Sequence, residues 1–345
     1  MRIAVDAMGG DHAPVAIVAG AVQAARAHGL DILLVGPATL VERELHRLER
    51  GGGDVRVLDA PDVVAMTEAP VAALKRKPGA SVRVALEAVK RGEADACFTA
   101  GHTGAAVFAA YSTFGLAPGV ERPALAALIP TRRGVAVLVD AGATVDCRPR
   151  FLVQFAVLGR LFATATLGIA SPRVALLSVG EEPSKGNELV REAHALLAQG
   201  VPGFVGNLDA RDLYRGEADV VVCDGFTGNV VLKASEGLVA TLEDLLTAEL
   251  ARSWRSKLGF RLSRKALGRL RHRIDEAEYG GAPLIGVDGI CIVGHGRSSP
   301  RAVRNGIGLA ARFVREGWLT QVSAALSRQA PAGGLEAPVS RADAR

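Results

Sequence analysis

The chain consists of short apolar runs that stop repeatedly at clusters of glycine and polar residues, with helical stretches between most of them. Strand-like runs that alternate with helical stretches predict βαβ units on a mainly parallel sheet with helices on both faces. The expected fold is therefore α/β, a three-layer αβα sandwich. The strand-like runs are 3–6, 32–35, 55–58, 94–99, 124–129, 135–139, 174–179, 204–205, 220–223 and 290–293, and the clearest helical stretches are 15–27, 81–91, 151–165 and 188–198.

Seven glycine and polar clusters follow these runs. In chain order they read DAMGGDHAP (6–14), TAGHTGA (99–105), DAGATVDCRP (140–149), SVGEEPSKGNE (178–188), VGNLDA (205–210), CDGFTGNVV (223–231) and VGHGRSS (293–299). The loops that follow parallel strands meet along one edge of the sheet, so we expect the seven segments to converge on one crevice there.

Glycines in these loops favour an anionic ligand. Without a Cβ atom, a loop lets a ligand approach main-chain N–H groups, and a helix that starts after the loop adds unpaired donors and partial positive charge. A phosphate group or a developing oxyanion suits such a site. One such loop is more often only structural, so the prediction depends on their number. The candidate binding residues are Asp6, Gly9, Gly10, Asp11, Gly101, His102, Thr103, Gly104, Asp140, Gly142, Asp146, Gly186, Asn187, Asn207, Asp224, Gly225, Gly228, His295, Gly296 and Ser298.

Two further loop residues are candidates for catalysis. Lys185 is the one lysine in a predicted strand-end loop, where its ammonium would bind phosphate or stabilise an oxyanion; otherwise it is a surface lysine paired with a neighbouring glutamate. Asn229 would offer an amide donor at the start of a helix, unless it is an ordinary N-cap. A lone histidine such as His102 or His295 is more often a structural hydrogen-bonding group than a catalyst.

Several enzyme classes are disfavoured. The sequence lacks a dinucleotide-binding G-x-G-x-x-G, a Walker lysine loop, a G-x-S-x-G elbow and an H-E-x-x-H helix. The histidines and carboxylates have no metal-ligand spacing, so we expect neither a metal nor a nucleotide cofactor. The cysteines, which we expect to be reduced and structural, are Cys97, Cys147, Cys223 and Cys291.

The positive charge is concentrated in one segment. Residues 252–274 hold nine lysines and arginines and no acidic residue, and removing these nine from the net charge of +5 leaves −4. Apolar residues spaced by four drift around a straight helix, so we expect two shorter helices, broken near Gly259 or Gly268. This basic arm, 251–279, would pack against a second copy or touch anionic lipid or an acidic protein. Its expected contact residues are Arg252, Trp254, Arg255, Leu258, Arg261, Leu262, Arg264 and Lys265.

Length and composition fit one globular unit. With 345 residues, of which 49% are hydrophobic and 4% aromatic, the chain has ample material for a core. There is no uncharged apolar stretch of about 18 residues, so we expect a cytoplasmic protein that does not span a membrane. No linker divides residues 1–329, and 330–345 have the composition of a disordered tail.

The order of these motifs resembles one known family. DAMGGD, AGHTGA, DAGATVDCRP, GEEPSKGNE, GNLDARD, DVVVCDGFTGNVVLK, YGGAPLIGVDG and GHGRSS occur in the order found in bacterial phosphate acyltransferases, which make acyl-phosphate from acyl-acyl carrier protein. The resemblance runs from Met1 to about Leu326. His102 and Thr144 stand where the family more usually has asparagine.

The resemblance implies a homodimer with a fold similar to phosphotransacetylases and isopropylmalate-type dehydrogenases, without an organic cofactor or a nucleic-acid partner. It implies that inorganic phosphate attacks the thioester of acyl-acyl carrier protein, with Lys185 and Asn229 as catalytic residues. It also implies peripheral association with the membrane, where a glycerol-3-phosphate acyltransferase uses the product. Two alternatives stay open: a phosphotransacetylase acting on short-chain acyl-CoA, and a membrane-docking scaffold without catalysis.

Overall fold

The computed structural model describes residues 1–48, 54–274 and 276–329, so the predicted tail at 330–345 lies outside the described residues. One sheet of 11 strands has the order β3-β2-β1-β4-β11-β10-β5-β6-β9-β7-β8. The strands are β1 (Arg2–Asp6), β2 (Asp31–Gly36), β3 (Val55–Asp59), β4 (Ala96–Thr99), β5 (Ala124–Thr131), β6 (Gly134–Val139), β7 (Val174–Ser178), β8 (Phe204–Asp209), β9 (Val220–Val222), β10 (Ala282–Ile285) and β11 (Cys291–Val293).

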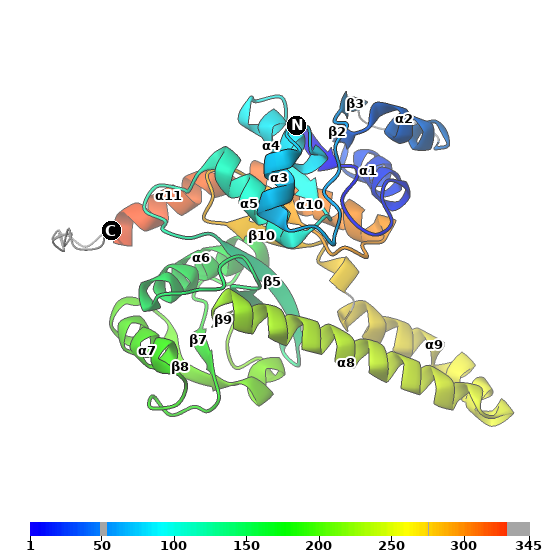
Figure 1. Cartoon of the computed structure of the whole chain (residues 1–345). Coiled ribbons are helices and arrows are strands. Elements are labelled where there is room, and N and C mark those ends of the chain that lie inside the picture. The colour runs from blue at the N-terminus through cyan, green and yellow to red at the C-terminus, as the bar shows by residue number, and fades with distance from the viewer. Residues whose placement is uncertain (49–53, 275, 330–345) are drawn as a thin grey trace.

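Helices cover both faces of this sheet (Figure 1), as the sandwich prediction requires. The helices are α1 (Val15–His28), α2 (Ala38–His46), α3 (Pro70–Arg76), α4 (Ser81–Lys90), α5 (Thr103–Phe114), α6 (Pro149–Leu167), α7 (Glu188–Gly200), α8 (Gly225–Ala251), α9 (Trp254–Ile274), α10 (Pro300–Arg315) and α11 (Trp318–Gln329), with short 3-10 turns at Ala210–Arg215 and Glu276–Glu278. One core layer holds side chains of α1, α6, α7 and α10, and the opposite layers hold those of α4, α5 and α8. The three-layer prediction is confirmed.

The strands change direction halfway across the sheet. Seven strand pairs are parallel, but β11–β10, β10–β5 and β5–β6 are antiparallel. After these three reversals, β6 to β9 run opposite to β1 to β4 and β11. We call β1 to β4, β10 and β11 the first half of the sheet, and β5 to β9 the second half. The expectation of one shared edge is therefore wrong, because strands of opposite direction end at opposite edges.

A buried aromatic cluster joins the two halves. Phe162 of α6 stacks on Phe313 of α10 with ring centroids 5.8 Å apart, and Trp318 of α11 meets both rings edge-on. Helix α6 is the one helix of the described chain long and apolar enough to cross a bilayer, but half of its apolar window is buried in the protein. Its hydrophobicity is therefore explained by its central position in the core.

The basic arm is part of a longer helical hairpin. Helices α8 and α9 project together from the second half (Figure 1), and α9 runs unbroken past Gly259 and Gly268. The expected break at these glycines is wrong, because a glycine inside a helix costs only about 1 kcal/mol and packing overrides it. The turn lies instead at Arg252 and Ser253. The side chains of Trp254 and Leu258 lie outside the described set, and the other predicted arm residues, from Arg252 to Lys265, are exposed.

Candidate functional site

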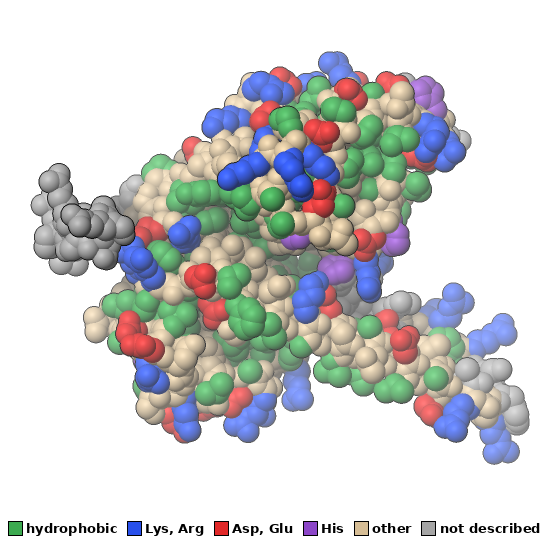
Figure 2. Space-filling view, viewed as in Figure 1, with side chains coloured by type: hydrophobic (Ala, Val, Ile, Leu, Met, Phe, Trp, Pro, Cys, Tyr) green, Lys and Arg blue, Asp and Glu red, His purple; other side chains and the backbone are tan. Residues whose placement is uncertain are grey.

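A cavity of about 270 Å³ lies between the two halves, where Figure 2 shows the surface hollowed. It brings together six of the predicted binding and catalytic residues. They are Asp11, Gly101, Thr103, Asn229, His295 and Gly296. The loops after β1, β4 and β11 form one wall and the first turns of α8 form the other, so one crevice forms although the sheet has two carboxyl edges.

Glycines let the loops of the first half touch one another. A Cβ on Gly9 would lie 2.6 Å from the backbone nitrogen of Gly101, and Gly10 has φ +104° with its missing Cβ 2.8 Å from the oxygen of Gly296. The N–H of Asp11 donates to that same oxygen at 2.7 Å. A side chain at either glycine would force the loops apart, so these residues shape the wall of the cavity.

Asp6 supports this wall from inside. It is buried, and its carboxylate accepts hydrogen bonds from the Thr99 hydroxyl at 2.7 Å and from the N–H of Met8 at 3.2 Å. Burial raises the pKa of Asp6, against the opposing effect of its hydrogen bonds from Ser81, Thr99 and Met8. Asp6 therefore holds loops together and does not line the cavity.

His102 and Ser298 also have structural contacts. His102 is the N-cap of α5, and its Nδ1 accepts a hydrogen bond from the N–H of Gly104 at 3.1 Å. The Ser298 hydroxyl is buried and donates to the backbone oxygen of His295 at 2.6 Å. Thr103, by contrast, lines the cavity. It is the first residue of α5, and the start of a helix has N–H groups without partners inside the helix.

Asp140 organises the wall of the second half. Its buried carboxylate accepts N–H groups of Leu125, Gly142, Ala143 and Thr144 at 2.6 to 3.1 Å. Burial raises the pKa of Asp140 to about 6, although these four donors favour the charged form. The loop that it holds packs Gly142 against the side chain of Asn229, since a Cβ on Gly142 would lie 3.4 Å from the Cβ of Asn229.

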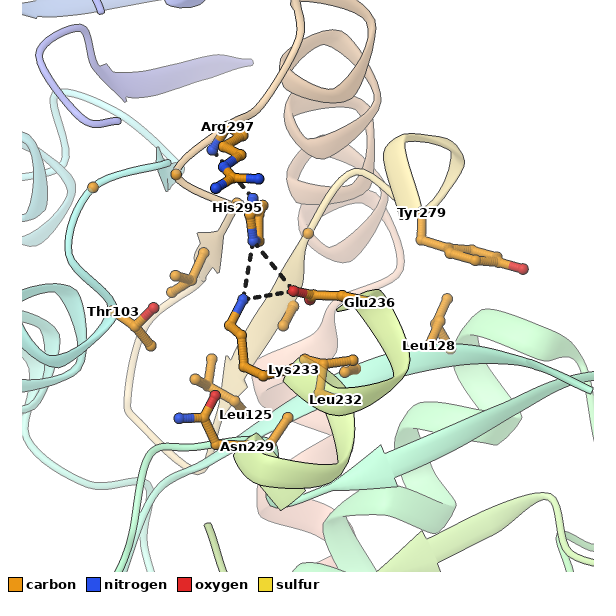
Figure 3. Close-up of a pocket in the computed structure, with 18 of the residues that line it drawn as sticks. Thr103, Leu125, Leu128, Asn229, Leu232, Lys233, Glu236, Tyr279, His295 and Arg297 are labelled. Atoms are coloured by element: carbon orange, nitrogen blue, oxygen red, sulfur yellow. Dashed lines mark hydrogen bonds and ion pairs between the residues drawn. The ribbon is translucent and has the colours of Figure 1, made fainter. Parts of the chain in front are cut away.

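Asn229 is not the N-cap of α8. The cap is Asp224, which accepts hydrogen bonds from the N–H and hydroxyl of Thr227 at 2.8 and 2.6 Å. The start of the helix packs tightly on the Asp140 loop: a Cβ on Gly228 would lie 1.9 Å from the oxygen of Asp140, and one on Gly225 2.6 Å from its carboxylate. This packing fixes the helix so that the Asn229 amide points into the cavity (Figure 3).

Lys233 and Glu236 also line the cavity. The sequence analysis did not predict them, because they lie within α8 and not in a glycine-rich loop. The ammonium of Lys233 lies 2.8 Å from the Glu236 carboxylate and 2.9 Å from Nε2 of His295 (Figure 3). Burial alone would raise the pKa of Glu236, but hydrogen bonds from His295 and Lys233 lower it to about 2. The signal was present in the sequence, since residues 229, 233 and 236 share one helix face.

The other candidates lie away from this cavity. Gly186, Asn187 and Asp224 line a second cavity of about 300 Å³, which meets α8 at Thr227 and Val231, on the side opposite Asn229. Lys185 is exposed in the loop between β7 and α7 and lines neither cavity. Asp146 is exposed, and the Asn207 amide donates to the backbone oxygen of Glu182 at 2.9 Å. Lys185 and Asn229 therefore do not share a cavity, and a joint catalytic role stays a prediction.

In the described part of the chain, no three His, Cys, Asp or Glu side chains gather as a metal site would require. The cavity instead combines hydrogen-bond donors with apolar side chains. Its apolar wall is formed by Leu125, Ala127, Leu128, Ala141, Leu232 and Val293. A crevice lined in this way between two halves of a sheet suits a ligand that has a polar group next to an apolar one.

Comparisons with solved structures identify the fold. The Streptococcus pyogenes phosphotransacetylase has the same fold, with a TM-score of 0.60 and 19% identity over 92% of this chain and 94% of that one. A 4-hydroxythreonine-4-phosphate dehydrogenase from Klebsiella pneumoniae follows, with a TM-score of 0.52 and 15% identity over 91% and 99%. At such identities the likeness concerns the fold alone, and it confirms the predicted phosphotransacetylase-like and dehydrogenase-like architecture.

Sequence relatives are more specific. The chain belongs to the fatty acid synthesis protein family, whose model matches residues 1–321. It is 47% identical over 326 residues to the phosphate acyltransferase of Pelotomaculum thermopropionicum, covering 94% of this chain and 95% of the relative. It is 50% identical over 316 residues to the phosphate acyltransferase of Thermosynechococcus vestitus, covering 91% and 92%. The chain is thus an enzyme of an acyltransferase family, and the resemblance to phosphate acyltransferases is confirmed.

Proposed function

We propose that this chain is a phosphate acyltransferase that moves a long-chain fatty acyl group from acyl-acyl carrier protein to inorganic phosphate. The product is an acyl-phosphate for phospholipid synthesis through lysophosphatidic acid. One observation carries the proposal: the cavity between the two halves combines hydrogen-bond donors with an apolar wall of leucine, alanine and valine. A phosphate and an acyl thioester need these two environments side by side.

The reaction needs no external oxidant or proton. An oxygen of HPO₄²⁻ attacks the thioester carbonyl carbon, the C–S bond breaks from the tetrahedral intermediate, and the phosphate proton ends on the departing thiol. The enzyme has to bring two partners together and stabilise the oxyanion. Asn229 is proposed as an amide donor to that oxyanion, because its side chain faces the cavity and the Asp140 loop fixes the helix that carries it. The helix start at Thr103 supplies further donor capacity.

The hairpin of α8 and α9 is proposed to contact a second copy of the chain and the membrane. Exposed leucines repeat at helical spacing on the outer part of α8, at Leu238, Leu242 and Leu245. A second copy of the chain would bury this stripe in a homodimer. On α9, Phe260 and Leu262 are exposed between arginines, which suits shallow contact with an anionic membrane. Figure 2 shows apolar side chains along the hairpin and basic ones towards its end.

These features favour acyl-acyl carrier protein over a small donor. A basic surface attracts an acidic carrier protein. Contact of this cytoplasmic protein with the membrane would bring its lipophilic product to a membrane-bound glycerol-3-phosphate acyltransferase. The second candidate is a phosphotransacetylase that uses short-chain acyl-CoA, which the fold of the Streptococcus pyogenes enzyme favours. That reaction would leave the apolar wall and the basic hairpin without a role.

The test compares the donors directly. Pure protein is incubated with inorganic phosphate and either palmitoyl-acyl carrier protein or acetyl-CoA, and free thiol is measured over time. The proposal expects phosphate-dependent release of carrier thiol and much slower release from acetyl-CoA. Preference for acetyl-CoA would establish the second candidate, and release from neither donor would leave the third possibility, a membrane-docking scaffold.

A further inference from the structure

Three side chains from the two halves of the sheet meet around one carboxylate oxygen. Lys233 Nζ lies 2.8 Å from Glu236 Oε2, and His295 Nε2 lies 3.5 Å from the same oxygen. Lys233 and Glu236 come from α8, while His295 comes from the loop after β11, as Figure 3 shows. All three side chains line the cavity between the halves.

The backbone fixes the histidine ring from behind. Nδ1 of His295 accepts a hydrogen bond from the N–H of Arg297 at 3.1 Å. In a neutral ring this bond leaves the proton on Nε2, the nitrogen that faces Lys233 and Glu236. His295 therefore presents an N–H donor to the cavity. The Ser298 hydroxyl, bonded to the His295 backbone oxygen, fixes the same loop.

The cluster offers a ligand in the cavity several N–H donors. The low pKa of Glu236, about 2, keeps its carboxylate ionised at neutral pH, where it balances the ammonium of Lys233. A lysine ammonium has three N–H groups, and its hydrogen bond to Glu236 engages one of them. Nε2 of His295, 2.9 Å from the ammonium, is itself a donor in this tautomer, so two donors lie side by side there. Arg297 adds a guanidinium to the lining of the cavity and Asp11 adds a carboxylate, so two cationic side chains stand with two carboxylates there. The N–H donors of the cavity, on Asn229, Lys233, His295 and Arg297, outnumber these carboxylates, which favours an anion.

We infer that Lys233 and His295 form the phosphate-binding pair of the cavity, and that Glu236 is a positioning residue that aims both donors at the phosphate. This inference rests on the proposed function for its choice of ligand. In it, the Lys233 ammonium and the His295 Nε2–H each donate to a phosphate oxygen, while Glu236 keeps its hydrogen bond from Lys233 and stays beside the His295 ring. Asn229 stands one helical turn before Lys233, so the carbonyl that phosphate attacks would lie next to the Asn229 amide.

The same contacts would also exist in a purely structural tie between the halves. A tie and a positioning residue differ in what their loss changes. A lost tie lowers stability and affects both substrates alike. A lost positioning residue weakens the use of phosphate in particular, because two donors are no longer held towards it.

The experiment uses the full chain with Glu236→Gln, which keeps the shape and removes the charge, and Glu316→Gln as a matched control. Glu316 pairs with Arg312 at 2.8 Å on α10, outside the cavity. We expect kcat/KM for phosphate to fall by about 100-fold in Glu236→Gln. The KM for palmitoyl-acyl carrier protein should stay within about twofold of the wild-type value, because the acyl contacts are untouched. Glu236→Asp should recover part of the loss, and Glu316→Gln should behave as wild type.

A binding measurement without acyl donor separates this inference from the proposed function. Phosphate that binds the folded protein raises its Tm, and it also stabilises proteins nonspecifically, so variants are compared at equal phosphate and at equal ionic strength set with sodium chloride. Lys233→Met and Glu236→Gln should lose the specific part of this rise, and Glu316→Gln should keep it. If Glu236→Gln does not fold, Lys233→Met, a change at an exposed side chain, carries the test.

The possible results of these two experiments distinguish the inference from a structural tie and from the proposed function. An unchanged phosphate-dependent Tm rise in Lys233→Met would overturn the inference, as would an unchanged kcat/KM for phosphate in Glu236→Gln. Lower stability with equal losses for both substrates would make the cluster a structural tie. A specific rise that Lys233→Met abolishes, in a protein that releases no thiol from any acyl donor, would support the anion site while the proposed acyl transfer fails.

Discussion

The two ends of α8 differ in what constrains them. The inner end, Gly225–Glu236, packs on the Asp140 loop and carries the polar groups of the cavity. The outer end, from Gly237 to Ala251, has exposed leucines, and a Cβ on Gly237 would meet nothing within 4 Å. One continuous helix therefore links a site defined by close contacts to an arm whose leucines are exposed. A substitution at one end should affect chemistry, and one at the other end assembly.

Two glycines of α8 give the largest expected contrast. Gly228→Ala places a Cβ 1.9 Å from the Asp140 oxygen, so the helix start must move. We expect a loss of about 3 kcal/mol in the free energy of unfolding and of about 100-fold in turnover, since Asn229 moves with it. Gly237→Ala has open space and should stabilise the helix by about 1 kcal/mol. Thermal unfolding and thiol release measure both. Equal behaviour of the two variants would remove the distinction between the ends.

Lys185 tests whether the site extends beyond the inner end of α8. Lys185→Ala is expected to reduce turnover by about 100-fold if this cation contributes a preorganised charge. The Tm should not change, because the side chain is exposed. Steady-state thiol release decides the matter. Turnover above half the wild-type rate would leave Lys185 as a surface residue and confine the site to the cavity between the halves.

The outer end is tested by its leucines. Leu242→Glu with Leu245→Glu places charges on the stripe proposed for the homodimer and should give monomers in size-exclusion chromatography with light scattering. Phe260→Glu with Leu262→Glu should instead reduce co-sedimentation with anionic vesicles at moderate salt by about tenfold, since apolar contact and attraction are both lost. Turnover in solution should stay within about twofold. If both double variants remain dimeric and bind vesicles, neither role belongs to the hairpin.

The smallest expected difference between the two ends of α8 concerns how the free energy of unfolding depends on pH. Glu236 has its pKa lowered from 4.5 to about 2 in the folded protein, so its contribution to stability is present above pH 4.5 and is lost as the pH falls towards 2. The difference in unfolding free energy between wild type and Glu236→Gln should be on the order of 2 kcal/mol at pH 7 and shrink through that window. At the outer end, Glu249→Gln breaks an exposed pair with Arg252 and should cost less than about 1 kcal/mol. A pH-independent difference for Glu236 would contradict its ionic contacts.

The layers and most strands could be predicted because apolar runs and helical periodicity are local signals. The strand β10 was missed because it has four residues between glycine-rich turns. It is antiparallel to both of its neighbours, so the reversal of β6 to β9 comes from the hairpin of β5 and β6, which were predicted as strands but not as an antiparallel pair. The order of the strands across the sheet depends on pairing between distant segments, which local patterns do not contain. The loops after β7 and β9 do share an edge, because these strands are parallel neighbours, but Asn229 and the loop of Gly186 lie on opposite sides of α8.

The residues of the candidate site also differ in whether a local sequence signal identifies them. Glycine loops identified Gly101, Asn229 and His295 correctly as neighbours of one cavity. Lys233 and Glu236 lie within a helix, where charged residues are usually a solvated surface, so only the position of that helix against His295 gives them a role. Asp6 and Asp140 are buried and hold loops from within the core, and their predicted contact with ligand stays a prediction.

The most direct test of the account is the transfer of labelled phosphate. Wild type and Asn229→Ala are incubated with ³²P-labelled inorganic phosphate and palmitoyl-acyl carrier protein, and labelled palmitoyl-phosphate is separated and counted. We expect labelled acyl-phosphate from wild type in step with thiol release, and about 100-fold less from Asn229→Ala with little change in the KM for phosphate. Thiol release without labelled acyl-phosphate, or equal product from both proteins, would contradict acyl transfer to phosphate in this cavity.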